Sequence, residues 1–113
     1  MVKEVNVIYT EILARIASIY HFTQGHTLET FEDDEKTIAA CTMYLQVIWE
    51  QAWRFTKYCS HIPTQMPLPQ MIGMRNIISH DYANVFAWEL RATITIDLPA
   101  LEQIIKQEME LTK

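Results

Sequence analysis

Apolar residues recur at helical spacing through the first part of the chain. Between residues 2 and 22 they follow one another at steps of three and four, at Val5, Ile8, Ile12, Ile16 and Ile19. This spacing places them on one side of an amphipathic helix, and no proline or glycine interrupts the stretch. Gly25 is the expected stop, because glycine readily adopts the left-handed conformation that ends a helix. A short connection is expected after it.

The run Asp33, Asp34 and Glu35 predicts the start of a second helix, since acidic and capping side chains are favourable at a helix N-terminus. This helix is expected to reach about Tyr58. Its apolar stripe has the spacing of a helix packed lengthwise on others. The stripe consists of Ile38, Cys41, Leu45, Ile48, Ala52 and Phe55.

Trp49 and Trp53 lie beside that stripe, so the second helix is apolar over more than one ordinary face. One interpretation is that both tryptophans complete a large core within the monomer. The other is that a second face of the helix packs against another chain. The sequence leaves both open.

Proline divides the next part of the chain. Residues 58–69 contain three prolines and show no periodicity, which predicts a loop. A third helix is expected to begin between Pro67 and Pro69, where proline is tolerated in a first turn, and to reach about Ser79. Asn84 can then cap a fourth helix that runs through Ile96.

Asp97 and Pro99 predict a last helix that ends near Thr112, with Asp97 as its cap and Pro99 in its first turn. Residues 93–96 alternate like a strand, but four residues between helical patterns are too few to make one. The sequence therefore predicts an all-α, up-and-down bundle of four to five helices in a single domain, residues 1–113.

The composition agrees with a globular helical protein: 50% of the residues are hydrophobic, 20% are charged and only two are glycine. No uncharged apolar run of about 18 residues occurs, and the first residues lack the features of a signal peptide. We therefore expect no membrane segment and a cytoplasmic location. Cys41 falls on the apolar stripe, where we expect it to act as a small hydrophobic residue rather than a nucleophile or half of a disulfide.

Charge is distributed unevenly along the chain. The net charge of −5 would disfavour nucleic-acid binding if it were evenly spread. However, residues 51–80 carry Arg54, Lys57 and Arg75 and no acidic residue. This segment is either a helix end with a polar loop or part of a nucleic-acid site, and charge alone favours the former.

Five side chains of varied chemistry lie within eight residues: Arg75, Asn76, His80, Asp81 and Tyr82. RNA cleavage without a metal needs a proton-transfer group that works near neutral pH, which suits histidine. It also needs a cation to stabilise charge on the phosphate, which suits a guanidinium. Asn76 could orient the phosphate or the imidazole, and Asp81 could tune His80 or cap a turn. By itself, an Arg and His pair at this spacing is more often a surface coincidence.

The spacing also sets a geometric condition. On a regular helix, Arg75 and His80 would project about 140° apart. They can therefore cooperate only if the helix ends near Ser79, or if each meets its counterpart across a two-fold axis.

Arg75, His80 and Tyr82 form a motif of Arg, four residues, His, one residue, Tyr. With its flanks, this motif resembles the HepT-like branch of the HEPN superfamily. The flanks that carry the resemblance are Ile72, Gly73, Met74, Asn76, Ile78, Trp88 and the run Asp97, Leu98, Pro99, Ala100 and Leu101. The similarity extends roughly from residue 62 to residue 105.

The resemblance implies a HEPN-like helical bundle that forms a homodimer, with two copies of the motif facing one another across a cleft. It implies a metal-independent endoribonuclease, the toxin of a HEPN/MNT toxin–antitoxin system, with Arg75 and His80 catalytic and Asn76 and Asp81 supporting. RNA is then the substrate, and the site holds no metal or cofactor.

The antitoxin of this family is a minimal nucleotidyltransferase (MNT), which would transfer AMP from ATP to Tyr82. Phosphate groups placed beside Arg75 would compete with RNA for the same cation.

Two other functions stay open. The chain could be a non-catalytic nucleotide- or nucleotidyltransferase-binding helical subunit, or a purely structural dimer in which Arg75 and Tyr82 close an interface. The other histidines, His21, His26 and His61, show no metal-ligand spacing, and we interpret them as surface or loop residues.

Overall fold

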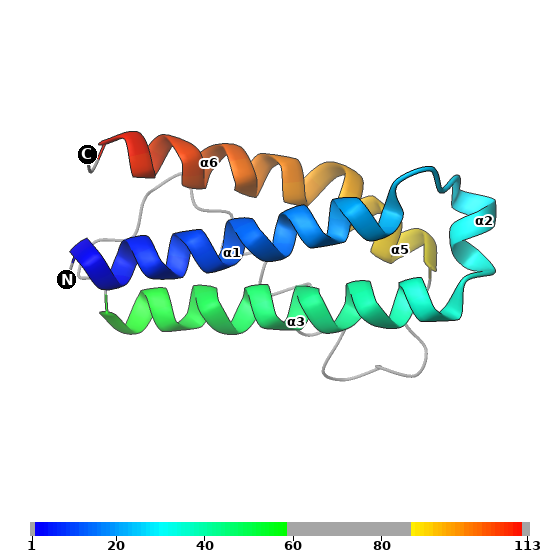
Figure 1. Cartoon of the computed structure of the whole chain (residues 1–113), viewed down its shortest axis with the longest axis horizontal. Coiled ribbons are helices and arrows are strands. Elements are labelled where there is room, and N and C mark those ends of the chain that lie inside the picture. The colour runs from blue at the N-terminus through cyan, green and yellow to red at the C-terminus, as the bar shows by residue number, and fades with distance from the viewer. Residues whose placement is uncertain (1, 59–86, 112–113) are drawn as a thin grey trace.

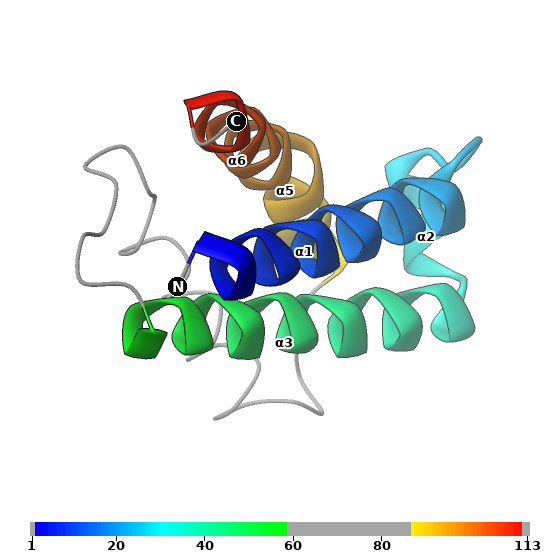
Figure 2. The same cartoon turned by 60° about the vertical axis from the view of Figure 1, so that its left-hand side comes forward.

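The computed structural model describes residues 2–58 and 87–111, and all the regular structure in these two ranges is helical. Helices α1 (Val2–Thr23) and α3 (Glu35–Tyr58) lie side by side and antiparallel, and α6 (Leu98–Leu111) lies along the other side of α1 (Figure 1). Figure 2 shows the same order in a turned view, with α1 between α6 and α3. The predicted all-α, up-and-down bundle is confirmed. Within the described ranges, no helix is both long and apolar enough to span a membrane.

The apolar pattern of α1 is confirmed. Ile8, Ile12, Ile16 and Ile19 are buried, with at most 2% of each residue exposed. The helix ends at Thr23, and Gly25 has a φ of +82°, the left-handed conformation expected of a glycine that follows a helix.

The start of α3 is also confirmed. The Asp34 carboxylate accepts hydrogen bonds from the backbone N–H and the hydroxyl of Thr37, at 3.1 and 2.7 Å. The stripe residues Cys41, Leu45, Ile48 and Ala52 are buried against α1, with at most 5% exposed.

Trp49 is only 6% exposed and belongs to the same core, so its indole packs inside the monomer. Of the two interpretations of the tryptophans, the structure supports the core for Trp49. The side chain of Trp53 lies outside the described residues.

The short connection predicted after Gly25 contains a helix, α2 (Leu28–Glu32). Thr27 caps it in a reciprocal arrangement: its hydroxyl accepts from the Thr30 N–H, and the Thr30 hydroxyl accepts from the Thr27 N–H. A capping box normally has Glu or Gln three residues after the capping Ser or Thr. Because Thr30 stands at that position, the sequence lacks the usual signature of a helix start here. Phe31 anchors α2 in the core, with 0% of its surface exposed.

The predicted break at Asp97 is wrong. Helix α5 (Ala87–Ala92) passes through a π-helical turn, η2 (Thr93–Asp97), directly into α6. The Leu98 N–H donates to the Thr93 carbonyl, five residues back, and Leu98 keeps helical angles, with φ −65° and ψ −43°. Asp97 therefore lies within a continuous helical run and caps nothing. A proline ring in a helix clashes with the carbonyl four residues earlier, and the wider π turn just before Pro99 accommodates it.

This C-terminal run completes the core of the bundle. Leu90, Ile94, Leu98, Leu101 and Ile105 are each at most 3% exposed and belong to the same core as the isoleucines of α1, which α6 contacts directly. The third helix, predicted to end at about Ser79, and the Asn84 cap lie outside the described residues.

Candidate functional site

The five motif residues lie outside the described part of the chain. Arg75, Asn76, His80, Asp81 and Tyr82 all fall between the end of α3 at Tyr58 and the start of α5 at Ala87. Their convergence on one pocket therefore stays a prediction.

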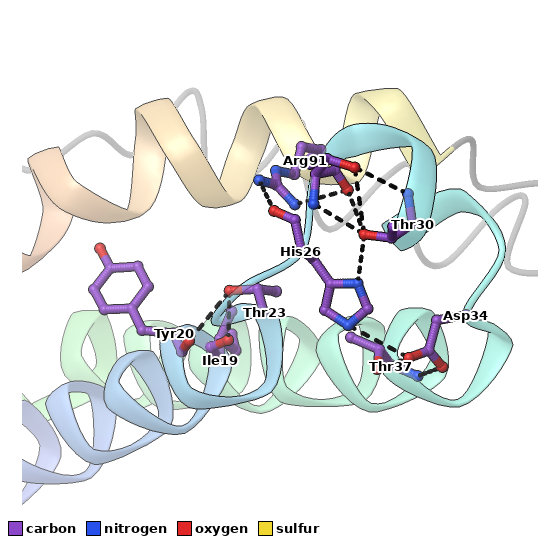
Figure 3. A network of polar contacts seen from close by, with 9 residues as sticks. Ile19, Tyr20, Thr23, His26, Thr30, Asp34, Thr37 and Arg91 are labelled. Atoms are coloured by element: carbon purple, nitrogen blue, oxygen red, sulfur yellow. Dashed lines mark hydrogen bonds and ion pairs between the residues drawn. The ribbon is translucent and has the colours of Figure 1, made fainter.

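A polar cluster that the sequence did not indicate lies where α1, α2, α3 and α5 come together. We call it the α2 junction and define it by His26, Thr27, Thr30, Asp34 and Arg91 (Figure 3). Its members come from the α1–α2 loop, from α2, from the cap of α3 and from α5. The junction thus joins residues near position 30 to the helix that follows residues 59–86.

The imidazole of His26 is bound through both ring nitrogens. Nδ1 lies 3.0 Å from the Thr30 hydroxyl, and Nε2 lies 3.4 Å from Oδ2 of Asp34. The ring also meets the buried Phe31 ring edge-on, with 6.2 Å between centroids. His26 lies in a loop, as predicted, but its side chain is only 20% exposed, so it is a structural member of the junction. His21, on α1, is exposed as predicted, and His61 lies outside the described residues.

Asp34 combines capping with charge. Its hydrogen bonds from Thr37 lower the pKa of its carboxyl group, and the neighbouring His26 lowers that pKa further. The carboxylate therefore stays ionised to a lower pH than an ordinary aspartate. An anion at this position is favourable both for the N-terminus of α3 and for a positively charged His26.

Arg91 attaches α5 to the junction. Its Nη2 donates to the His26 carbonyl at 2.8 Å, and its Nη1 lies 3.5 Å from the Thr27 carbonyl. The guanidinium carbon also lies 5.8 Å from the centre of the Phe31 ring, within the range of a cation–π contact. One side chain on α5 thus holds the loop before α2 by two carbonyls and an aromatic ring.

Other polar side chains of the described ranges are partly buried. Arg15 of α1 lies over the Tyr44 ring of α3, with 5.2 Å from the guanidinium carbon to the ring centre. Burial and the nearby Glu102 carboxylate raise the pKa of Tyr20. Burial likewise raises the pKa of Asp97 at the end of η2. These contacts are consistent with packing, and none pairs a nucleophile with a base.

Cys41 does not provide a reactive thiol. Burial, with a contribution from Asp34, raises its pKa to about 11, and the side chain is completely buried in the core. A thiol of this kind is almost entirely protonated near neutral pH. The prediction that Cys41 acts as a small hydrophobic residue is confirmed.

In the two described ranges, no three His, Cys, Asp or Glu side chains come close enough together to hold a metal ion. His26 and Asp34 are paired with each other and with threonine hydroxyls, so that cluster is built as a hydrogen-bond network.

The chain matches the model of one protein family, described as ribonuclease HepT-like, over residues 12–108. The matched region runs from the middle of α1 to the last turns of α6 and includes residues 75–82. No solved structure gives a significant match to the chain. Since the family match covers most of the sequence and agrees with the all-helical fold, this chain belongs to the ribonuclease HepT-like family.

Proposed function

We propose that this protein is a metal-independent endoribonuclease and the toxin of a HEPN/MNT toxin–antitoxin pair. The observation that carries the proposal is the family match over residues 12–108, which includes the whole Arg75 to Tyr82 motif. The side chains of that motif are of the types that metal-free RNA cleavage requires.

In this proposal, His80 moves protons at the 2′-hydroxyl or at the leaving oxygen. Arg75 stabilises the negative charge that builds on the phosphorus centre, since a planar guanidinium can bind two phosphate oxygens at once. Asn76 orients the phosphate or the imidazole, and Asp81 tunes His80. Two copies of the chain form a homodimer in which both motifs face a shared cleft.

The same proposal assigns regulation to Tyr82. A minimal nucleotidyltransferase antitoxin transfers AMP from ATP to the Tyr82 hydroxyl, and the added phosphate competes with RNA for Arg75. The toxin itself then needs no cofactor, and ATP serves only the partner enzyme.

The nuclease activity is tested with purified protein and a labelled single-stranded RNA, with and without EDTA. We expect cleavage that persists in EDTA and is lost in His80→Ala. The matched control is His21→Ala, which removes an exposed histidine from α1 and should leave cleavage unchanged. Cleavage that needs a divalent metal would contradict the mechanism. A protein that binds the nucleotidyltransferase but leaves RNA intact would favour the non-catalytic binding subunit.

The modification is tested by intact-mass measurement after co-expression with a minimal nucleotidyltransferase, the enzyme that the proposal makes the antitoxin. We expect mass increases in steps of one adenylyl group, absent in Tyr82→Phe. Tyr44→Phe is the matched control, because Tyr44 packs between α1 and α3 and should not affect the steps. Modification that persists in Tyr82→Phe would assign it to another residue.

A further inference from the structure

Helix α5 is the element into which the motif segment leads. Tyr82 precedes Ala87, the first residue of α5, by five positions. A chain of five residues spans at most about 17 Å, because each residue adds no more than about 3.5 Å. The position and the tilt of α5 therefore limit where the residues just before it can lie.

The π turn η2 is a point at which α5 can tilt. It joins α5 to α6, and π turns are common sites of helix bending. Beyond this turn, Leu98 and Leu101 hold α6 in the core. Ala87 lies six residues before Thr93, the first residue of η2, which is about 9 Å of helix. A tilt of about 10° at the turn would thus move the start of α5 by about 1.5 Å.

Two residues of α5 oppose such a tilt. Leu90 is buried and belongs to the common core. Arg91 reaches the loop before α2, where its Nη2 donates to the His26 carbonyl at 2.8 Å (Figure 3). Apolar burial of Leu90 is non-directional, whereas the hydrogen bond fixes a distance and an angle. Arg91 therefore supplies a contact that can set the orientation of α5.

The loop that accepts from Arg91 is itself held in place. Thr27 and Thr30 cap α2 reciprocally, and Phe31 anchors that helix in the core. The guanidinium carbon of Arg91 also lies 5.8 Å from the centre of the Phe31 ring. Because the acceptor belongs to a capped and anchored element, the bond from Arg91 fixes α5 relative to the bundle.

We propose that Arg91 is a positioning residue for the site at Arg75 and His80. By holding α5 against the loop before α2, it fixes the point at which the motif segment enters α5. Catalytic groups must be held close to their productive geometry, and a misplacement of about 1 Å can lower a rate by about a hundredfold. This inference rests on the proposed nuclease function and adds to it a residue outside the motif.

The role of Arg91 is tested by steady-state RNA cleavage with the full-length protein. Arg91→Met keeps an unbranched side chain but removes every N–H donor. We expect its kcat to fall on the order of tenfold and its KM to change by less than about twofold, because the catalytic geometry is impaired while the RNA contacts remain. A higher KM with unchanged kcat would overturn the proposal, since it would make Arg91 an RNA contact.

Two further variants separate positioning from a general loss of stability. Ile12→Val removes a buried methyl group from α1, and at a temperature where circular dichroism shows it folded, its kcat should equal that of the wild type. An equal loss of kcat in Ile12→Val and Arg91→Met would overturn the proposal. Arg91→Lys keeps a charged donor for the His26 carbonyl but loses the flat guanidinium, and its kcat should fall only about threefold. If Arg91→Met does not fold, an unchanged kcat in folded Arg91→Lys would overturn the proposal instead.

A measurement without RNA separates failure of this inference from failure of the proposed function. In NMR spectra, the amide signals of residues 75–82 should shift or broaden in Arg91→Met and stay in place in Ile12→Val. Signals that do not respond to Arg91→Met would overturn the positioning role, even where the wild type cleaves RNA. A wild type that leaves RNA intact would contradict the nuclease, and the NMR comparison would still decide whether Arg91 positions the motif.

Discussion

The seam between α1 and α3 and the α2 junction are built on different principles. The seam consists of aliphatic side chains at helical spacing, such as Ile12, Ile16 and Leu45, each at most 2% exposed. The junction consists of directional contacts, in which His26 and Arg91 bind particular atoms on other elements. The stabilisation from apolar burial is non-directional and depends on the area removed from water, whereas a hydrogen bond needs a particular donor facing a particular acceptor. The seam therefore provides most of the stability, and the junction determines where short elements attach.

The largest effect should come from the seam. Ile16→Ala should lower the free energy of unfolding by about 3 kcal/mol, because Ile16 is 0% exposed and its removal leaves a cavity between helices. Urea unfolding followed by circular dichroism measures the change. Val7→Ala is the matched control: it truncates an aliphatic side chain on the same helix where 50% is exposed, and should cost less than about 0.5 kcal/mol. Similar losses in both variants would mean that the burial pattern of α1 is wrong.

The second-largest effect should come from a substitution in the α2 junction. Arg91→Gln should lower the free energy of unfolding by about 1.5 kcal/mol, since it removes a charged donor from the His26 carbonyl and the contact with Phe31. Amide hydrogen exchange should increase in α2 and α5 more than in α1 and α3. Exchange that increases equally in all four helices would show that the junction is not a separate attachment.

Substitutions of Asp34, the cap of α3, should change the Tm by a smaller amount. They separate the contribution of the capping hydrogen bonds from that of the negative charge. Asp34→Ala should lower the Tm, because the Thr37 N–H and hydroxyl lose their acceptor. Asp34→Asn should lower it less, since asparagine caps helices about as well as aspartate. Equal Tm values for the two variants at pH 7 would show that the Thr37 hydrogen bonds contribute nothing measurable.

The smallest expected effect is the loss of the Asp34 contribution to stability at low pH. The pKa of Asp34 in the folded protein lies below its ordinary value, chiefly because of the Thr37 hydrogen bonds. Its contribution to stability is thus complete above the unfolded-state pKa of about 3.9 and is lost as the pH falls through the lower folded-state value. Urea midpoints at pH 5 and pH 2.5 should differ more in the wild type than in Asp34→Asn. An equal difference would contradict the lowered pKa.

The elements that the sequence predicted well are those with a local cause. The isoleucine spacing of α1, the stop at Gly25 and the cap at Asp34 each depend on residues within a few positions, and all three are confirmed. The break at Asp97 was predicted from the same kind of local signal and is wrong, because Ile94, Leu98 and Leu101 are all buried in the core and the helix continues through the π turn between α5 and α6. For residues 75–82, residue types and spacing predicted a candidate site. That the Arg75 and His80 side chains converge on one pocket stays a prediction.

The sequence by itself determined the two long helices, their buried faces and the family, because helical periodicity and a short motif are properties of neighbouring residues. Only the tertiary structure decided that His26 is held by Thr30 and Asp34, and that Arg91 reaches back to the His26 carbonyl. Those contacts join positions up to 65 residues apart in the chain. No local pattern encodes such a contact, because its partners meet only after the long helices have packed.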